Sequence, residues 1–121
     1  MNPERRKTAR VPVYMKTINE TKEFDFAFSY AKDISPGGMA LDTKIFLGDE
    51  KKLKIGNNLK LKFKIPGGRF YISAIGEVTR IDRSGESSVV IGLKFISLEN
   101  DFLKEIENFV EESKKGNLVL E

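Results

Sequence analysis

Apolar and polar residues alternate along most of the chain, with the period of two that is typical of strands buried on one face. Between residues 59 and 65, leucine, phenylalanine and isoleucine alternate with lysine, which predicts one side facing a core and one facing water. Phe24, Phe26, Phe28 and Tyr30 alternate with smaller or polar residues, and the pattern predicts that all four face the core. Altogether the alternation predicts strands over residues 11–18, 24–32, 39–43, 59–65, 70–81 and 89–95.

Clusters of turn-forming residues separate these segments. Pro36-Gly37-Gly38 follows the second segment, and Pro66-Gly67-Gly68 follows the fourth. Pro36-Gly37 fits the central positions of a type II turn, while Pro66-Gly67-Gly68 and the Ser84-Gly85 region are predicted to close hairpins. About six short strands with regular turns favour an antiparallel barrel or sandwich.

The periodicity changes near residue 99. Apolar residues at positions 102, 103, 106, 109 and 110 follow helical spacing and predict an amphipathic helix over residues 99–114. Ser97 or Asn100 is expected to cap its start, and Gly116 to end it in a left-handed conformation. We therefore expect an all-β protein with a terminal helix, organised as an arm (1–10), a barrel (11–98) and a helix packed on it (99–115).

Composition narrows the functional classes. The chain has 121 residues, the size of one domain, and it contains no cysteine and no histidine. Thiolate nucleophiles, cysteine-ligated zinc and the commonest general base are thereby excluded, so we expect neither an enzyme nor a metal or other cofactor. No signal peptide or apolar membrane span is present, which predicts a cytoplasmic protein, and the net charge of +3 suits an anionic ligand.

The basic arm carries the first pattern with chemical meaning, Arg6-Lys7-Thr8-Ala9-Arg10, directly preceded by Arg5. Arginine presents a planar fork of donors that matches phosphate oxygens and also pairs bidentately with guanine O6 and N7. Taken alone, such a pair is more often a solvated basic tail.

The second pattern is Asp33-Ile34-Ser35-Pro36-Gly37-Gly38, a DxSxxG at the end of a predicted strand. An ionised Asp33 accepts hydrogen bonds and so suits the donors of a guanine edge. Ser35 adds a hydroxyl, and Gly38 allows a ligand to approach the backbone closely. These are also ordinary turn residues, and the hexapeptide alone is more often only a turn.

In this order and spacing, RxxxR and DxSxxG resemble the PilZ domain family, whose members bind the bacterial second messenger cyclic di-GMP. Later segments agree with it: Ile55-Gly56, Gly76-Glu77-Val78-Thr79-Arg80-Ile81 and Ile91-Gly92-Leu93-Lys94-Phe95 resemble the family's later strands. The resemblance covers residues 5–112. It implies a six-stranded antiparallel split barrel with a C-terminal helix and a ligand on the barrel surface.

The resemblance also implies roles for individual residues. Arg6 and Arg10 would hold guanine and phosphate groups, Asp33 and Ser35 would read a guanine edge, and Gly37 and Gly38 would lie at the ligand, with Arg80 as a lower-ranked contact. Arg5 favours two intercalated ligand molecules per chain. Such a receptor would order its arm on binding and signal to an effector protein that the sequence does not identify, in motility, secretion or exopolysaccharide control.

Two alternative functions remain compatible with the sequence. One is a small barrel that binds single-stranded nucleic acid. The absence of tryptophan, the small net charge and the aromatic residues at core positions argue against it. The other is a PilZ-like protein-interaction module without ligand, against which the intact motif positions argue.

Overall fold

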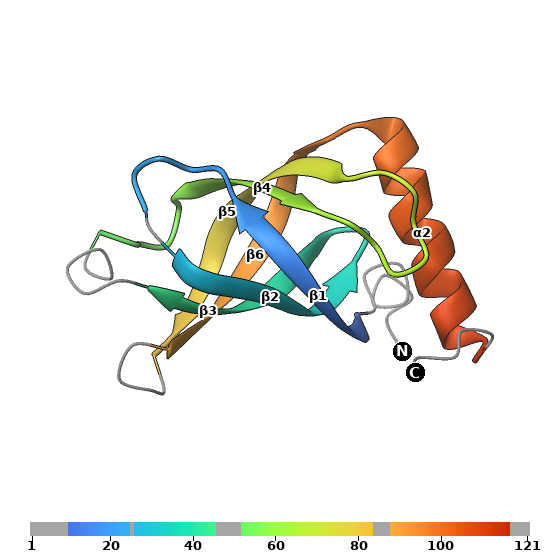
Figure 1. Ribbon diagram of the computed structural model, residues 1–121, viewed down its shortest axis with the longest axis horizontal. Helices are drawn as coiled ribbons and strands as arrows, with labels where there is room; N and C mark the ends of the chain where they lie inside the picture. Colours follow the sequence, from blue (N-terminus) through green and yellow to red (C-terminus); the bar gives the residue numbers. More distant parts are fainter. Residues whose placement is uncertain (1–9, 25, 46–51, 84–87, 117–121) are drawn as a thin grey trace, which may run out of the picture.

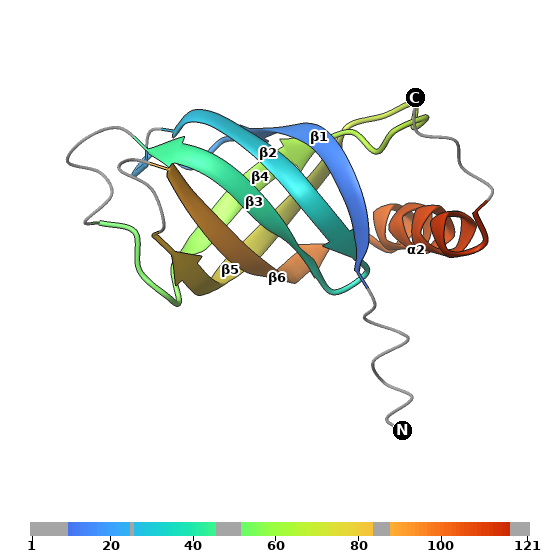
Figure 2. The ribbon, with the colours of Figure 1, turned by 90° about the horizontal axis from the view of Figure 1, so that it is seen from below.

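The computed structural model describes residues 10–24, 26–45, 52–83 and 88–116. Six antiparallel strands form a closed barrel in the order β1-β2-β3-β6-β5-β4, and a helix follows at one end (Figure 1). The strands are β1 (Val11–Asn19), β2 (Phe26–Ser35), β3 (Gly38–Ile45), β4 (Asn58–Phe63), β5 (Ile72–Asp82) and β6 (Ser88–Leu98), and the helix is α2 (Asn100–Lys114). The predicted fold, an antiparallel barrel with a C-terminal helix, is therefore confirmed, and Figure 2 shows the strands coiling around one axis.

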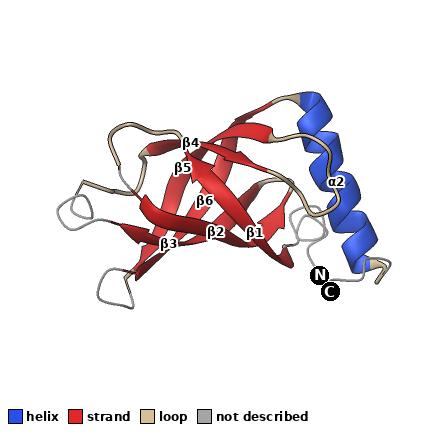
Figure 3. Ribbon diagram, viewed as in Figure 1, coloured by secondary structure: helices blue, strands red, loops and turns tan. Residues whose placement is uncertain are grey.

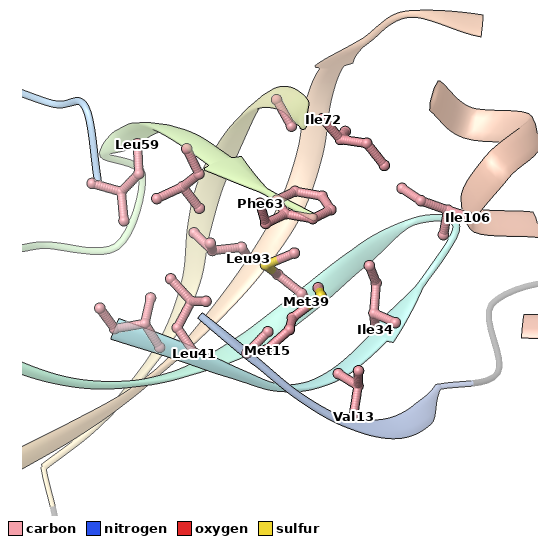
Figure 4. Packing of buried hydrophobic residues seen from close by; sticks show 14 of the residues in the cluster. Val13, Met15, Ile34, Met39, Leu41, Leu59, Phe63, Ile72, Leu93 and Ile106 are labelled. Carbon is pink, nitrogen blue, oxygen red and sulfur yellow. The ribbon is translucent and has the colours of Figure 1, made fainter. Parts of the chain in front are cut away.

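Alternation produces the barrel interior as the sequence predicts. In β1, buried and exposed residues alternate without interruption from Val11 to Ile18. In β4, three apolar residues are fully buried between outward-facing lysines. Aliphatic and methionine side chains from all the strands meet at the centre, around Phe63 (Figure 4). This continuous core is the main favourable term for folding.

Strand β2 departs from the prediction that its aromatic residues all face inward. Phe24 is buried just before the strand and Phe26 is partly buried, but Phe28 is 40% exposed, while Ser29 and Ala31 take the inward positions. The cause is an irregularity in the pairing of β2 with β3 between Phe26 and Phe28, because one extra residue reverses the inside–outside phase. The prediction was therefore wrong for Phe28 and for Tyr30, which packs beside Phe28 on the outer face. One argument against nucleic-acid binding, that the aromatics occupy core positions, falls with it.

Helix α2 closes one end of the barrel, as Figure 3 shows. Its buried residues are Ile106, Phe109 and Val110, and it contacts β1 and β2. Figure 4 places Ile106 near Ile34 of β2. The predicted cap is wrong: the helix begins after Glu99, which makes no side-chain capping bond, and Ser97 belongs to β6. Gly116 follows the helix with φ +73°, as expected.

Candidate functional site

The two sequence motifs meet across the pair of strands β1 and β2. Pro12 lies opposite Asp33 in the antiparallel register, so Arg10, just before β1, lies beside Asp33 although 23 positions separate them. The Arg10 guanidinium donates from Nη1 to Asp33 Oδ1 at 2.9 Å. Both side chains are partly exposed, with 42% and 29% of their surfaces accessible. The barrel therefore presents a cation and a carboxylate together at its surface.

Asp33 is held by the backbone as well as by Arg10. The backbone N–H of Ala40 on β3 donates to the same oxygen, Oδ1, at 3.2 Å. No contact in the described residues uses the second oxygen, Oδ2. Among the described residues the carboxylate is thus fixed in orientation and has one oxygen that accepts no hydrogen bond, an arrangement that suits a ligand with paired N–H donors.

The hydroxyl of Ser35 is occupied by its own turn. Ser35 is 2% exposed, and its Oγ accepts from the backbone N–H groups of Gly37 and Gly38, each at 3.2 Å. The same Oγ lies 3.4 Å from the Gly38 carbonyl oxygen, to which it donates. Ser35 therefore shapes the β2–β3 connection. Its predicted contact with a guanine edge stays a prediction.

The two glycines of the motif also have structural roles. Gly37 is not among the described glycines with positive φ, so the expected type II turn at Pro36-Gly37 is wrong. Its carbonyl oxygen accepts from the N–H of Phe95 on β6 at 2.8 Å. A Cβ on Gly38 would lie 2.0 Å from the carbonyl oxygen of Leu93, which no side chain tolerates. Gly38 is thus required by the neighbouring strand, whether or not a ligand also approaches it.

A row of small residues starts beside Asp33 and runs across the adjacent strands β3 and β6 to Arg80 on β5. Asp33 pairs with Ala40 on β3, Ala40 with Gly92 on β6, and Gly92 with Arg80 on β5. A Cβ on Gly92 would lie 3.2 Å from Arg80 Cβ, so the absence of a side chain there gives Arg80 room to lie over the strand. Three strand spacings separate Asp33 from Arg80, about 14 Å along the surface. Ala40 and Gly92 therefore leave a strip without large side chains between the Asp33 carboxylate and the Arg80 guanidinium, and we call this strip the floor.

The structure thus brings together Arg10, Asp33, Ser35, Gly37 and Gly38, and places Arg80 at the far end of the floor. Arg5 and Arg6 lie outside the described residues. Sequence reasoning missed Ala40, whose N–H orients Asp33 and whose side chain is 1% exposed. No signal in the sequence marks an alanine for this role, because it depends on the register of β2 and β3. Gly92 was noticed only as part of a motif.

Two negative findings concern the described residues. No group of three or more acidic residues there is arranged to hold a metal ion. No helix in the described ranges is long and apolar enough to cross a membrane.

Comparison with solved structures finds the same fold in bacterial proteins. The inhibitor of motility MotI/DgrA of Bacillus subtilis matches with TM-score 0.75 and 16% identity, over 95% of this chain and 54% of that one. MrkH of K. pneumonia, solved with c-di-GMP, matches with TM-score 0.66 and 24% identity, over 93% of this chain and 54% of that one. This chain therefore spans about half the length of both proteins.

The PilZ domain of YcgR from Escherichia coli, solved with c-di-GMP, matches over nearly its whole length. The TM-score is 0.63 with 11% identity, over 94% of this chain and 99% of that one. No curated protein matches the sequence. The model of the PilZ domain family matches residues 4–112, most of the chain. The barrel, its helix and this match together establish that the chain belongs to the PilZ domain family.

Proposed function

We propose that this protein is a bacterial cyclic di-GMP receptor that binds the dinucleotide at Arg10, Asp33 and the row of small residues beside them, and that is not an enzyme. The observation that carries the proposal is the Arg10–Asp33 ion pair of 2.9 Å, which joins the RxxxR and DxSxxG motifs into one surface site. Two of the matched structures contain c-di-GMP, which supports the same ligand class. The proposal places the protein in the cytoplasm.

In this proposal the free Oδ2 of Asp33 accepts from the N1–H and N2–H₂ groups of a guanine. Arg10 and Arg6 contact phosphate oxygens and the guanine O6 and N7 atoms, for which a planar guanidinium provides matched donors. Arg10 can turn from Asp33 to the ligand at small cost, because an exposed ion pair contributes only about 0–1 kcal/mol. Arg80 lies where a second base or phosphate would reach the far end of the floor.

The proposed signal is the ordering of residues 1–10 over the bound ligand, which gives an effector protein a new surface to bind. Arg5 would stack on a base and favour two ligand molecules per chain. Hydrogen exchange of residues 4–12 with and without cyclic di-GMP tests the ordering, and we expect added protection with ligand. Equal protection in both states would contradict this mechanism but not the binding itself.

Calorimetric titration tests the ligand directly. We expect saturable binding of cyclic di-GMP at about 1 μM or tighter, which corresponds to roughly −8 kcal/mol. GTP and cyclic di-AMP serve as controls, since neither offers two guanine edges on a cyclic dinucleotide.

The substitution Arg10→Ala should abolish tight binding of cyclic di-GMP. The matched control is Arg69→Ala, since Arg69 is an exposed arginine at the connection between β4 and β5. Absence of binding up to millimolar cyclic di-GMP would overturn the proposal.

A further inference from the structure

A group of exposed aromatic and apolar side chains lies on the outer face of β1 and β2, further along the strands from the arginine–aspartate pair. Tyr14 is 77% exposed, and Ile18 and Phe28 are each 40% exposed. The Tyr14 and Tyr30 rings are stacked, with centroids 4.8 Å apart and planes 7° from parallel. Phe28 packs against Tyr30 at 5.9 Å in a tilted arrangement. We call Tyr14, Ile18, Phe28 and Tyr30 the aromatic patch.

The aromatic patch continues into a groove between the two strands. β1 and β2 pair as far as Lys16 and Tyr30, after which β1 turns to pair with β4 from Thr17 onward. The strands part there, and a groove of about 630 Å³ opens between them. Phe26, Phe28 and Tyr30 line it together with polar residues from the end of β1. A hydrogen bond of 2.7 Å between the buried Thr17 and Ser29 hydroxyls joins the parting strands.

Lysines surround the aromatic patch in the strand register. Lys16 lies opposite Tyr30, and Lys44 lies opposite Phe28. Neither lysine, nor the exposed Lys32 next along β2, has an ion-pair partner among the described residues. Lys62, opposite Ile18, is paired with Glu20 at 3.5 Å. One carboxylate, Asp42, lies opposite Tyr30 on β3, so the patch is an apolar centre with a rim in which lysines outnumber acidic residues.

We propose that the aromatic patch and its groove are a docking surface for another protein, which binds through a segment that has an apolar side chain between acidic residues. Buried aromatic anchors with charged residues at the rim are the composition of protein–protein hot spots. The partner's apolar side chain enters the groove beside Phe28, and its carboxylates pair with Lys16 and Lys44. The surface shares β1 and β2 with the nucleotide site, yet the proposal holds even if that site binds nothing.

Two other occupants fit the structure less well. Single-stranded nucleic acid needs free ring faces on which bases stack. Tyr14 and Tyr30 cover one face of each other, and Phe28 packs on Tyr30, so that the outer face of Tyr14 is the main one left. A second copy bound face to face would bring the lysine rims together, which is unfavourable.

Selection of peptides from a random 12-residue display library against the full chain tests the proposal. The selected sequences should carry Asp or Glu around one aromatic or aliphatic residue. In fluorescence anisotropy, Phe28→Ser and Tyr14→Ser should each weaken the best peptide about tenfold or more, and Lys16→Glu should weaken it at low salt. The matched control is Phe70→Ser, since Phe70 is 69% exposed in the connection between β4 and β5. Circular dichroism verifies that each variant is folded.

Several outcomes would overturn the proposal: no enriched peptide, or peptides that bind Phe28→Ser and Tyr14→Ser as tightly as the parent. Binding of oligothymidylate that is lost in Tyr14→Ser would assign the face to nucleic acid instead. A dimer in light scattering that Tyr14→Ser dissociates would assign it to a second copy. Titration of Phe28→Ser with cyclic di-GMP separates this proposal from the previous one, because unchanged nucleotide affinity is expected whether or not the peptide binds.

Discussion

Pro36-Gly37-Gly38 and Pro66-Gly67-Gly68 are copies of the same tripeptide, each in a connection between antiparallel neighbours of the barrel. In the second, Gly67 has φ +83° and the N–H of Gly68 donates to the Ile65 carbonyl at 2.7 Å. This is a turn of type II, held by the backbone alone. In the first, no positive φ occurs, and the Ser35 hydroxyl accepts from both glycine N–H groups.

The difference shows that the tripeptide does not decide the turn by itself, because the Ser35 hydroxyl and the neighbouring strand β6 also constrain the first connection. The residues of the DxSxxG motif also have different roles. Ser35 and Gly38 have structural roles: the Ser35 hydroxyl holds the turn, and Gly38 allows the close approach of Leu93. Asp33 has an oxygen, Oδ2, that accepts no hydrogen bond from the residues that the structure describes. The motif is therefore a scaffold that holds one partly exposed carboxylate, which is the proposed ligand contact.

The largest effect is expected for Gly38→Ala, which would place a Cβ 2.0 Å from the Leu93 carbonyl oxygen. Both atoms belong to paired strands, so that β3 and β6 must separate to admit the methyl group. We expect the free energy of unfolding to fall by about 3 kcal/mol, the upper part of the range for overpacking. Urea denaturation measures it. A loss below about 1 kcal/mol would mean that the close approach is relieved at little cost.

Ser35→Ala should have the next largest effect. Removal of the hydroxyl leaves the N–H groups of Gly37 and Gly38 without their acceptor, and Gly38 is buried. We expect a loss of roughly 2 kcal/mol in the free energy of unfolding. Ser73→Ala, at an exposed position of β5, is the control and should change the free energy of unfolding by less than about 0.5 kcal/mol. Equal values for the two variants would show that water replaces the hydroxyl.

In the other turn, Gly67→Ala should cost about 1 kcal/mol, because the open space around Gly67 leaves only the strain of positive φ. Chemical denaturation gives this value too. Cyclic di-GMP affinity should remain unchanged, since this turn lies outside the proposed site. Loss of affinity in Gly67→Ala would contradict the assignment of the site to the β2–β3 end.

The sequence alone predicts the strands, the barrel and the helix because burial follows alternation with a period of two or 3.6. It fails at two kinds of position. At Phe28 an extra residue reverses the phase, and periodicity does not reveal where strand pairing is irregular. At Ala40 and Gly92 the role depends on which residues lie opposite each other in adjacent strands, which no local pattern encodes. The resemblance alone assigned Arg10 and Asp33 to one site, and their ion pair was not predicted, because 23 positions separate the two residues.

Of these four substitutions, Asp33→Asn should change the free energy of unfolding least. It should nevertheless weaken cyclic di-GMP binding substantially. The amide oxygen of asparagine can still accept from the Ala40 N–H, and the lost ion pair with Arg10 is partly exposed. The free energy of unfolding should therefore change by less than about 1 kcal/mol. With the amide oxygen held at the Ala40 N–H, the amide nitrogen takes the position of Oδ2, so the guanine N1–H and N2–H₂ donors lose their acceptor. That loss of roughly 1–3 kcal/mol weakens cyclic di-GMP binding about tenfold to a hundredfold.

The matched control is Asp42→Asn, since Asp42 is an exposed carboxylate on β3 opposite Tyr30. This variant should bind cyclic di-GMP as the parent does. If calorimetry gave Asp33→Asn the affinity of the parent, the free oxygen of Asp33 would have no part in recognition, and its role would be limited to holding β3 and Arg10.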